Sequence, residues 1–267
     1  MTKTRIQKAF SRSARRYEAN ASLQQETARQ LSLWLISRLH GSSPRRILDI
    51  GIGTGYLTQL LRSYYPDAEI IGCDLACGML NIVRRKGLKK LNLLEADAER
   101  LPFKNAGFDL IVSNLTYQWV EDIASAMAEA LRILVPGGHL FFTSLGADSL
   151  QELRHSYSQA YLENKGCLPA FLQEFHNYAY LKDIIGQSGF RNICIERQLQ
   201  KLTYSSPHQL LNSLRNIGAV NSSRLRPKGL ASRRILQNME QFYQQTYSGA
   251  NGILATYEII RVEAGKG

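Results

Sequence analysis

The stretch Arg46-Ile47-Leu48-Asp49-Ile50-Gly51-Ile52-Gly53-Thr54-Gly55-Tyr56 decides the fold of this chain. Its short apolar run, residues 47–50, predicts a buried parallel strand. Three glycines at alternate positions follow, and an amphipathic segment that begins at Tyr56 predicts a helix. Glycine is needed in such a turn because a Cβ atom would block both the tight turn and the close approach of a ligand. The stretch therefore predicts half of a βαβ unit, in which the helix N-terminus offers free N–H groups. Taken alone, it fits an ordinary strand–helix turn equally well.

The composition is that of a folded protein with a strongly basic balance. The 267 residues are 44% hydrophobic and 21% charged, which allows one α/β domain with a modest accessory region. A net charge of +11 favours an anionic partner, either nucleic acid, anionic lipid or an acidic protein. No apolar run approaches the roughly 20 residues that span a bilayer. The four cysteines form no C-x-x-C pair, so we expect no metal site, no disulfide framework and a cytoplasmic location.

The N-terminal segment carries six basic residues before its first acid, Glu18, which is a feature of transit peptides. It has no apolar core of the kind found in secretory signals. Apolar residues recur there at helical spacing, first at Phe10, Ala14, Tyr17 and Ala21, then in a second run from residue 31 to 39. Because this regular pattern runs into the first strand, we predict a folded N-terminal helical cap, residues 1–44, in place of a cleaved leader.

Residues 45–146 alternate between strand and helix patterns and predict a parallel sheet with helices on both faces. The expected strands are residues 47–50, 69–74, 91–97, 108–114 and 139–144. A helix from Ile123 to Leu134 is expected to end in a turn at Pro136-Gly137-Gly138.

Residues 147–267 are expected to complete the sheet and to cover the site. Helices are predicted at 148–161 and 178–186, and strands at 193–196 and 254–260. Residues 206–245 are mostly helical in pattern and form a predicted lid. The basic residues of this lid are Arg215, Arg224, Arg226, Lys228, Arg233 and Arg234.

Acidic residues end three of the first strands, at the edge where open parallel sheets bind ligands. Asp74 follows Gly51 by 23 residues, the spacing of a ribose-binding carboxylate. A dinucleotide site is disfavoured because the third glycine comes one residue early and Asp49 would repel a pyrophosphate. The ammonium and sulfonium of S-adenosyl-L-methionine suit an acidic rim of Asp49, Asp74 and Asp97 better.

These motifs together resemble the class I S-adenosylmethionine-dependent methyltransferases. The matching stretches are residues 47–55, Gly72-Cys73-Asp74-Leu75, Glu95-Ala96-Asp97-Ala98 and Leu134-Val135-Pro136-Gly137-Gly138. The resemblance implies a Rossmann-like, seven-stranded, mostly parallel sheet whose last strand is antiparallel. It assigns the methionine moiety to Asp49, Gly51, Gly53 and Gly55, the ribose to Asp74, the adenine to Leu75, Met79, Asp97 and Ala98, and the surroundings of the methyl group to Asn114 and Leu115. For Met79, plain core packing is an equal alternative.

The acceptor is predicted from the ends of the chain. The fourth strand is followed by Asn114-Leu115-Thr116-Tyr117, which lacks both an Asn-Pro-Pro-Tyr motif and a cysteine, so base methylation is disfavoured. The whole chain resembles the malonyl-acyl-carrier-protein O-methyltransferases of biotin synthesis. The matching stretches are residues 10–17, 113–119, 144–146, 150–153, 214–219 and 255–258. The chain departs from that family at Thr116, where the family often has Ala, and at Ala76-Cys77-Gly78. The segment from Lys165 to Phe175 matches the family poorly.

This resemblance implies methyl esterification of the free carboxylate of a malonyl thioester. Such a carboxylate is already ionised at neutral pH, so the reaction needs positioning and desolvation and no base. We expect Arg215, or secondly Arg154, to hold the carboxylate, although either fits a solvated helix face. Tyr17 and Gln118 are expected to close over the donor or the acceptor, with a purely hydrophobic cap role as the alternative for Tyr17.

The expected partner is an acidic acyl carrier protein, docked electrostatically by Arg224, Arg226, Lys228, Arg233 and Arg234. We expect neither nucleic acid nor membrane as a partner, and a monomeric protein. Two other functions stay open. One is a small-molecule C- or O-methyltransferase of quinone type, and the other is a non-catalytic protein that retains only the cofactor-binding fold.

Overall fold

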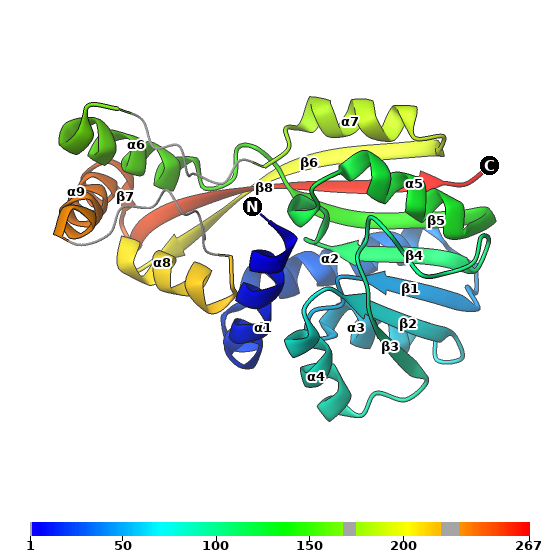
Figure 1. The fold of residues 1–267 in the computed structure, drawn as a ribbon. Helices are drawn as coiled ribbons and strands as arrows, with labels where there is room; N and C mark the ends of the chain where they lie inside the picture. The colour runs from blue at the N-terminus through cyan, green and yellow to red at the C-terminus, as the bar shows by residue number, and fades with distance from the viewer. Residues whose placement is uncertain (1, 168–174, 220–229) are drawn as a thin grey trace.

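The computed structural model describes residues 2–167, 175–219 and 230–267, and a single twisted sheet organises them (Figure 1). The strand order is β3-β2-β1-β4-β5-β8-β6. The strands are β1 (Arg46–Ile50), β2 (Glu69–Asp74), β3 (Leu91–Glu95), β4 (Phe108–Asn114), β5 (Leu134–Leu145), β6 (Arg191–Tyr204) and β8 (Gly252–Gly265). Neighbours among β1 to β5 pair in parallel, whereas β8 is antiparallel to both β5 and β6. The predicted, mostly parallel sheet with an antiparallel last strand is therefore confirmed. A two-residue strand, β7 (Ser248–Gly249), pairs with the start of β8 and was not predicted.

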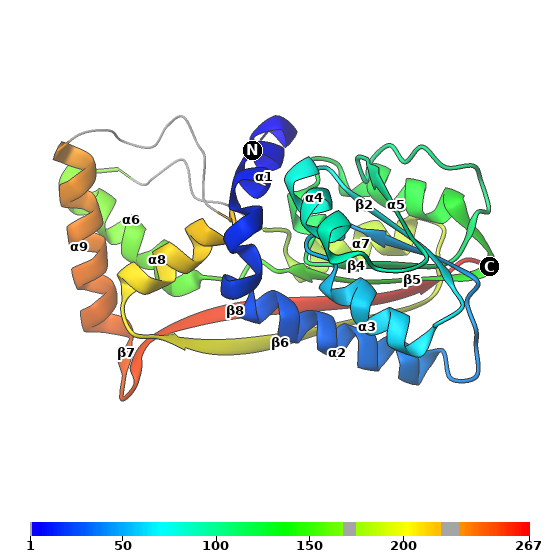
Figure 2. The same cartoon turned by 90° about the horizontal axis from the view of Figure 1, so that it is seen from below.

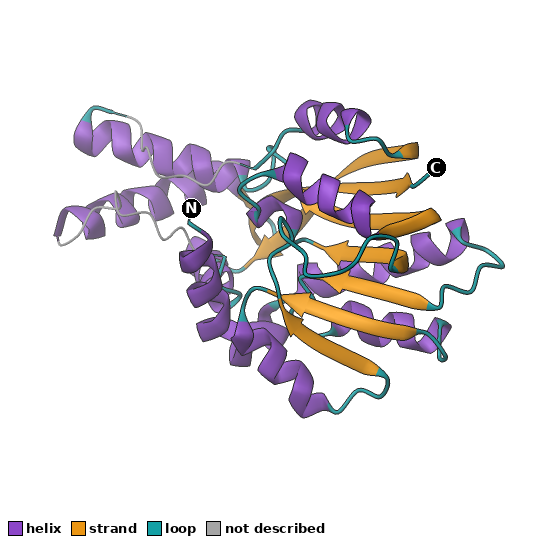
Figure 3. Cartoon of the chain, turned by 45° about the vertical axis from the view of Figure 1, so that its right-hand side comes forward, coloured by secondary structure: helices purple, strands orange, loops and turns teal. Residues whose placement is uncertain are grey.

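Helices cover both faces of the sheet (Figures 2 and 3). The helices are α1 (Lys3–Asn20), α2 (Ser22–Arg38), α3 (Tyr56–Tyr64), α4 (Cys77–Lys86), α5 (Ile123–Ile133), α6 (Gln151–Lys165), α7 (Tyr178–Gln187), α8 (Pro207–Asn216) and α9 (Leu230–Tyr247), with a short 3-10 turn at Tyr117–Trp119. Because side chains alternate along a strand, Ile47 packs with α2 and α3, while Leu48 packs with α5 and α7. This two-sided burial explains the apolar run that opens the sheet.

Local sequence sets several helix boundaries. The Asp122 carboxylate accepts hydrogen bonds from the backbone N–H groups of Ala124 and Ser125 and so begins α5. Ser206 caps α8 in the same way and is followed by a proline at the first helical position. Gly87, with φ +61°, ends α4 in the left-handed conformation that glycine adopts readily.

The fifth strand corrects one prediction. The expected turn at 136–138 is wrong, because β5 begins at Leu134, directly after α5. Leu134 lies opposite Phe108 and His139 lies opposite Leu110, so the residues between 134 and 139 form a bulge within the strand. The third strand is shorter than expected and ends at Glu95. The late strands are longer than expected, at 14 residues each.

Strands β6 and β8 extend beyond the other strands, and helices α6, α8 and α9 pack against this extension (Figure 1). Helix α6 packs against α9. A second hydrophobic cluster fills the space between these helices and the strands, and its largest members include Tyr161, Met239, Tyr243 and Tyr257. The division into residues 1–44, 45–146 and 147–267 stays a prediction. Of the basic lid residues, Arg233 and Arg234 are exposed on α9, whereas Arg224, Arg226 and Lys228 lie outside the described residues. Among the helices described, none has the length and apolar character that a bilayer crossing requires.

Candidate active site

The glycine turn after β1 depends on backbone conformations that disfavour side chains. Gly51, Gly53 and Gly55 have φ values of +71°, +56° and +81°. At Gly51 a Cβ atom would also lie 2.1 Å from the Thr116 hydroxyl oxygen, so the turn and the β4 loop are in direct contact. Asp74 fixes the turn from the neighbouring strand, since its two carboxylate oxygens accept hydrogen bonds from the N–H groups of Gly53 (2.9 Å) and Ala76 (2.7 Å).

Asp49 is a buried carboxylate beneath this turn. Its side chain is 1% exposed and accepts a hydrogen bond of 2.6 Å from the Thr58 hydroxyl. Burial raises the pKa of Asp49 to about 7; the Thr58 hydrogen bond lowers it and the charge of Asp74 raises it further. Within the described chain no cationic side chain forms an ion pair with Asp49. The site therefore offers a desolvated acid to a cationic ligand.

A hollow of about 100 Å³ lies above the turn and is called here the glycine hollow. It is lined by nine of the predicted cofactor-binding residues: Gly51, Gly53, Asp74, Leu75, Met79, Asp97, Ala98, Asn114 and Leu115. Asp49 lines a smaller hollow beside it, together with Gly51, Gly53 and Asn114. Gly55 lines neither of the two. Its α-carbon instead faces Val83 and Leu88 on the α4 side, so its predicted contact with a ligand stays a prediction.

Helix α1 closes the glycine hollow from outside. The Lys3 ammonium lies 2.6 Å from an Asp97 oxygen and 2.8 Å from a Glu99 oxygen. Further along, the α1 backbone at Ser11 approaches Gly78 so closely that a Cβ atom there would lie 2.5 Å from the Ser11 carbonyl oxygen. The departure from the family pattern at Gly78 thus allows α1 to pack on the start of α4. The part played by Lys3 was missed, because no motif links it to Asp97, 94 residues away.

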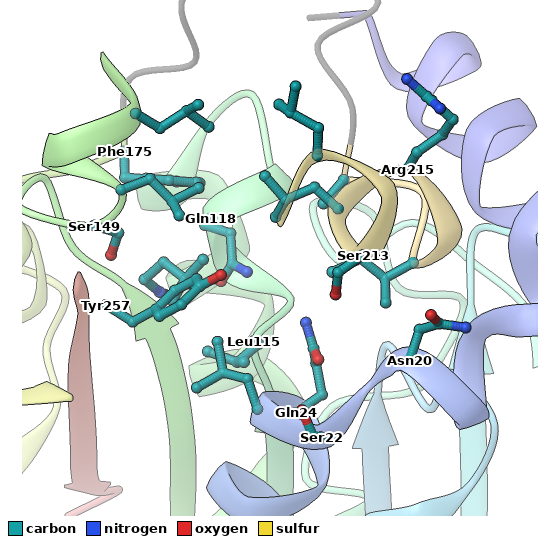
Figure 4. Close-up of a pocket in the computed structure, with 18 of the residues that line it drawn as sticks. Asn20, Ser22, Gln24, Leu115, Gln118, Ser149, Phe175, Ser213, Arg215 and Tyr257 are labelled. Atoms are coloured by element: carbon teal, nitrogen blue, oxygen red, sulfur yellow. Dashed lines mark hydrogen bonds between the residues drawn. The ribbon is translucent and has the colours of Figure 1, made fainter. Parts of the chain in front are cut away.

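A second cavity, of about 170 Å³ and mostly apolar, adjoins the glycine hollow and is called here the apolar cavity (Figure 4). Its walls come from the α1–α2 junction, the ends of β5 and β6, the middle of β8, and helices α6 and α8. Four residues line both spaces: Phe10, Tyr17, Leu115 and Trp119. The rings of Phe10 and Trp119 meet edge to face, with centroids 5.4 Å apart. The two spaces therefore share one wall.

Leu115 holds a strained position in this wall. It has φ +52°, a left-handed conformation that is rare for a leucine, and its side chain is buried. Its N–H group donates to the Thr143 carbonyl and hydroxyl oxygens at 3.1 and 3.0 Å, which secures the conformation. Backbone strain of this kind is frequent at functional sites.

Gln118 directs an uncharged hydrogen-bond donor into the apolar cavity. Its amide oxygen accepts from the Leu145 backbone N–H at 3.3 Å, which fixes the orientation of the amide. The amide nitrogen faces the cavity (Figure 4). Tyr17 also lines this space, and burial raises the pKa of its hydroxyl, so that it stays neutral.

The two arginines predicted to hold a carboxylate differ in their surroundings. Arg215 lines the apolar cavity but is exposed, and its guanidinium donates to the Asn212 amide oxygen and points away from the cavity centre (Figure 4). Arg154 is half-buried and donates to the carbonyl oxygens of Ser149 (2.9 Å) and Ala147 (2.5 Å). Its charge has no acidic partner among the described residues. This geometry favours Arg154 over the first choice made from sequence.

A pair of tyrosine hydroxyls in the apolar cavity was not predicted. Tyr204 and Tyr257 lie on the neighbouring strands β6 and β8, with their hydroxyl oxygens 3.0 Å apart. Burial raises the pKa of Tyr257 well above its ordinary value. The two residues are 53 positions apart in sequence, and only the strand pairing brings them together.

Comparisons with known proteins identify the family. A family model described as a methyltransferase domain matches residues 48–142. The malonyl-[acyl-carrier protein] O-methyltransferase of Halorhodospira halophila is 34% identical over 96% of this chain and 85% of its own. That of Paenibacillus sp. is 33% identical over 98% and 99% of the two chains. The chain belongs to this family. The biotin biosynthesis bifunctional protein BioHC of Saccharophagus degradans is 36% identical over 96% of this chain, which spans only 45% of that relative.

Solved methyltransferase structures share the fold of this family member. The YcgJ protein of Bacillus subtilis superposes with a TM-score of 0.61 at 16% identity, over 89% of this chain and 98% of its own. Phosphoethanolamine N-methyltransferase 2 of Haemonchus contortus, solved with S-adenosyl-L-methionine, superposes with a TM-score of 0.55 at 20% identity, over 88% of this chain and 52% of its own. These structures confirm the predicted class I methyltransferase fold, and the family match with the relatives confirms the predicted enzyme class and the S-adenosyl-L-methionine cofactor.

Proposed function

We propose that this enzyme methylates the free carboxylate of a malonyl group carried by acyl carrier protein, the substrate that the names of its relatives print. The observation that carries this proposal is the shared wall between the two spaces. Leu115 belongs to both, and the Gln118 amide nitrogen faces the apolar side. An acceptor held at Gln118 would thus lie next to the reactive end of a ligand in the glycine hollow.

The residues of the glycine hollow and of the smaller hollow beside it fit S-adenosyl-L-methionine. Asp49 is a buried acid with no cationic partner among the described residues, which suits the ligand's ammonium, and Gly51 leaves room where a Cβ atom could not be placed. We assign Asp74 to the ribose hydroxyls, and Leu75, Met79 and Ala98 to the adenine ring. Asp97 is already paired with Lys3, so α1 and the adenine edge share this carboxylate. When bound, the cofactor supplies a methyl group on a positively charged sulfur.

The residues around the apolar cavity need not remove a proton, because the acceptor carboxylate is ionised at neutral pH. Their task is to orient the carboxylate and to exclude water. The Gln118 amide donates one hydrogen bond, and Arg154 supplies an unpaired positive charge from the same cavity wall. Tyr17, Phe10 and Trp119 exclude water from the boundary between the two spaces. The hydroxyls of Tyr204 and Tyr257 offer hydrogen bonds to the thioester carbonyl further in.

Cofactor affinity is expected to rise with pH between about pH 5.5 and pH 7.5. Burial raises the pKa of Asp49 to about 7 and that of Asp74 to about 6 in the ligand-free enzyme. A bound cation favours the ionised carboxylate, so binding below about pH 7 must release a proton from Asp49, and the affinity then falls up to tenfold per pH unit. Because the folded pKa of Asp49 exceeds its unfolded value of about 4, its stabilisation of the ligand-free fold is lost as pH rises through about 7.

Isothermal titration of the cofactor across this pH range, with thermal unfolding alongside, measures the effect. The Asp49→Asn variant is the control, since it cannot titrate and should show weaker binding with a flatter pH profile. If the cofactor affinity of that variant depended on pH as steeply as that of wild type, Asp49 would not be the residue that binds the ammonium group.

The reaction itself is tested by incubating the enzyme with the cofactor and with malonyl-, succinyl- or acetyl-carrier protein. We expect a mass gain of one methyl group on the malonyl carrier and none on the acetyl carrier, which has no free carboxylate. Equal use of unrelated small acceptors would favour a quinone-type methyltransferase, and cofactor binding without turnover would favour a non-catalytic protein. The monomeric state and the cytoplasmic location stay predictions.

A further inference from the structure

Helix α1 presents a face of four basic side chains to solvent. Lys8, Arg12, Arg15 and Arg16 are all exposed, at spacings of four, seven and eight residues from the first, so they share one side of the helix. The opposite side is buried at Ile6, Ser13 and Ala14. These four residues are called here the basic face. They include most of the N-terminal basic run, which neither the fold nor the chemistry of the site explains.

Neighbouring elements hold α1 on both flanks and leave the basic face open. On one flank, Gly78 at the start of α4 contacts the Ser11 backbone. On the other, Gly218, just after α8, lies so close to α1 that a Cβ atom would be 2.7 Å from the Ser13 hydroxyl. The Asn216 amide also donates to the Asn20 side chain at 3.1 Å. The outward direction of the basic face is therefore fixed by packing.

The charges of the basic face are unbalanced. Glu18, the acid on α1, pairs with Lys86 of α4 at 2.9 Å, and Lys3 pairs with Asp97 and Glu99. Over the described parts of the chain, none of the four basic-face residues forms an ion pair, whereas Arg29, Arg38, Arg132 and Arg261 elsewhere do. Four like charges on one rigid surface produce a field that attracts an acidic partner over about 10 Å.

The inner side of the same helix forms part of the catalytic cavity. Phe10, Tyr17 and Asn20 line the apolar cavity from α1, and Arg215 lines it from α8 while remaining exposed to solvent. The basic face thus lies on the outside of the wall whose inside contacts the acceptor. A carrier protein bound there would be within reach of the cavity with its thioester-linked arm.

We propose that the basic face of α1 is the docking surface for the acidic carrier protein. This inference rests on the proposed function and assigns its partner to a different surface from the one expected on the lid. Docking through exposed charges accelerates encounter more than it tightens the final complex.

The test is the double variant Arg12→Glu/Arg16→Glu, which changes no described contact. With malonyl-carrier protein at low salt, we expect the KM to rise about tenfold while kcat stays unchanged. The difference in KM between the variant and wild type should shrink at about 0.5 M salt, where charges are screened over a few ångströms. A minimal malonyl thioester without the protein carrier should show the same KM in variant and wild type, and the cofactor Kd should not change.

The matched control is Lys104→Glu/Lys182→Glu, which makes the same change in net charge at exposed residues that line neither space. It should leave the KM for the carrier within about twofold of wild type. An equal rise in this control, or an unchanged KM in the α1 variant, would overturn the docking surface.

The remaining outcomes are also decisive. If the α1 variant raises the KM for the minimal thioester as much as the KM for the carrier substrate, α1 acts on the cavity and the docking proposal fails. If the variant loses binding to an RNA oligonucleotide but keeps its KM for the carrier, the face serves nucleic acid and the proposal fails likewise. If wild type methylates neither form of malonyl thioester, the proposed function fails, and this result is separate from the others.

Discussion

Gly51→Ala is expected to weaken cofactor binding about 100-fold, because the steric clash and the strained backbone each cost about 1–3 kcal/mol and a factor of ten is about 1.4 kcal/mol. The new Cβ atom would lie within 2.7 Å of three side-chain atoms of Thr116. Neither partner can move freely, since Gly51 has φ +71° and Leu115, beside Thr116, is itself left-handed. The turn and the β4 loop must separate, which opens the glycine hollow. Isothermal titration with the cofactor measures the loss.

Two further variants separate the clash from general backbone strain. Gly87→Ala places the same residue at φ +61° in open space and tests strain alone, for a cost of about 1–3 kcal/mol in stability. It should leave the cofactor Kd unchanged. Thr116→Gly removes the obstructing atoms, so the double variant Gly51→Ala/Thr116→Gly should regain much of the affinity. No recovery in the double variant would mean that contact with Thr116 is not the cause.

Gln118→Glu is expected to lower kcat/KM for malonyl-carrier protein about 100-fold, with the cofactor Kd unchanged. A hydrogen bond to a charged group contributes about 1.5–3 kcal/mol, or roughly 10- to 150-fold, and its loss is reinforced here by repulsion between two carboxylates. The new side chain has nearly the same shape and can still accept from the Leu145 N–H group. Steady-state kinetics with saturating cofactor give the value.

Gln151→Glu provides the matched control, because it makes the same amide-to-acid change at an exposed position of α6 that does not line the apolar cavity. Its kcat/KM should stay within about twofold of wild type. If Gln118→Glu also stays within that range, the acceptor carboxylate is not held at Gln118, and Arg154 becomes the principal contact.

The elements around the glycine turn were predictable because their signals are local. Buried strands in a parallel sheet are continuously apolar, and the acids at their ends are placed by strand length alone. The lengths of the two late strands were underestimated for a related reason. Strand β6 is at the sheet edge and mostly exposed, so its polar residues beyond Glu196 broke the apolar pattern although the hydrogen-bond ladder continues to Tyr204.

The contacts of the apolar cavity could not be predicted, since they depend on packing between distant segments. The Tyr204–Tyr257 pair follows from the register of β6 against β8, and the Lys3–Asp97 pair from the docking of α1. The choice between Arg154 and Arg215 likewise needed side-chain directions. Sequence placed both on helices, but only the structure shows one bonded to carbonyl oxygens of the cavity wall and the other pointing outward.

The boundary that the two spaces share also matters for inhibitor design. Phe10, Tyr17, Leu115 and Trp119 line both the glycine hollow and the apolar cavity, so one small molecule can occupy both. An analogue of the cofactor with a nitrogen atom in place of sulfur, carrying an apolar chain as its third substituent, would join two weak ligands into one. The second half then binds at a high effective concentration, and the combined affinity exceeds that of either part by orders of magnitude. Such a compound would discriminate against methyltransferases in which the two spaces are separated.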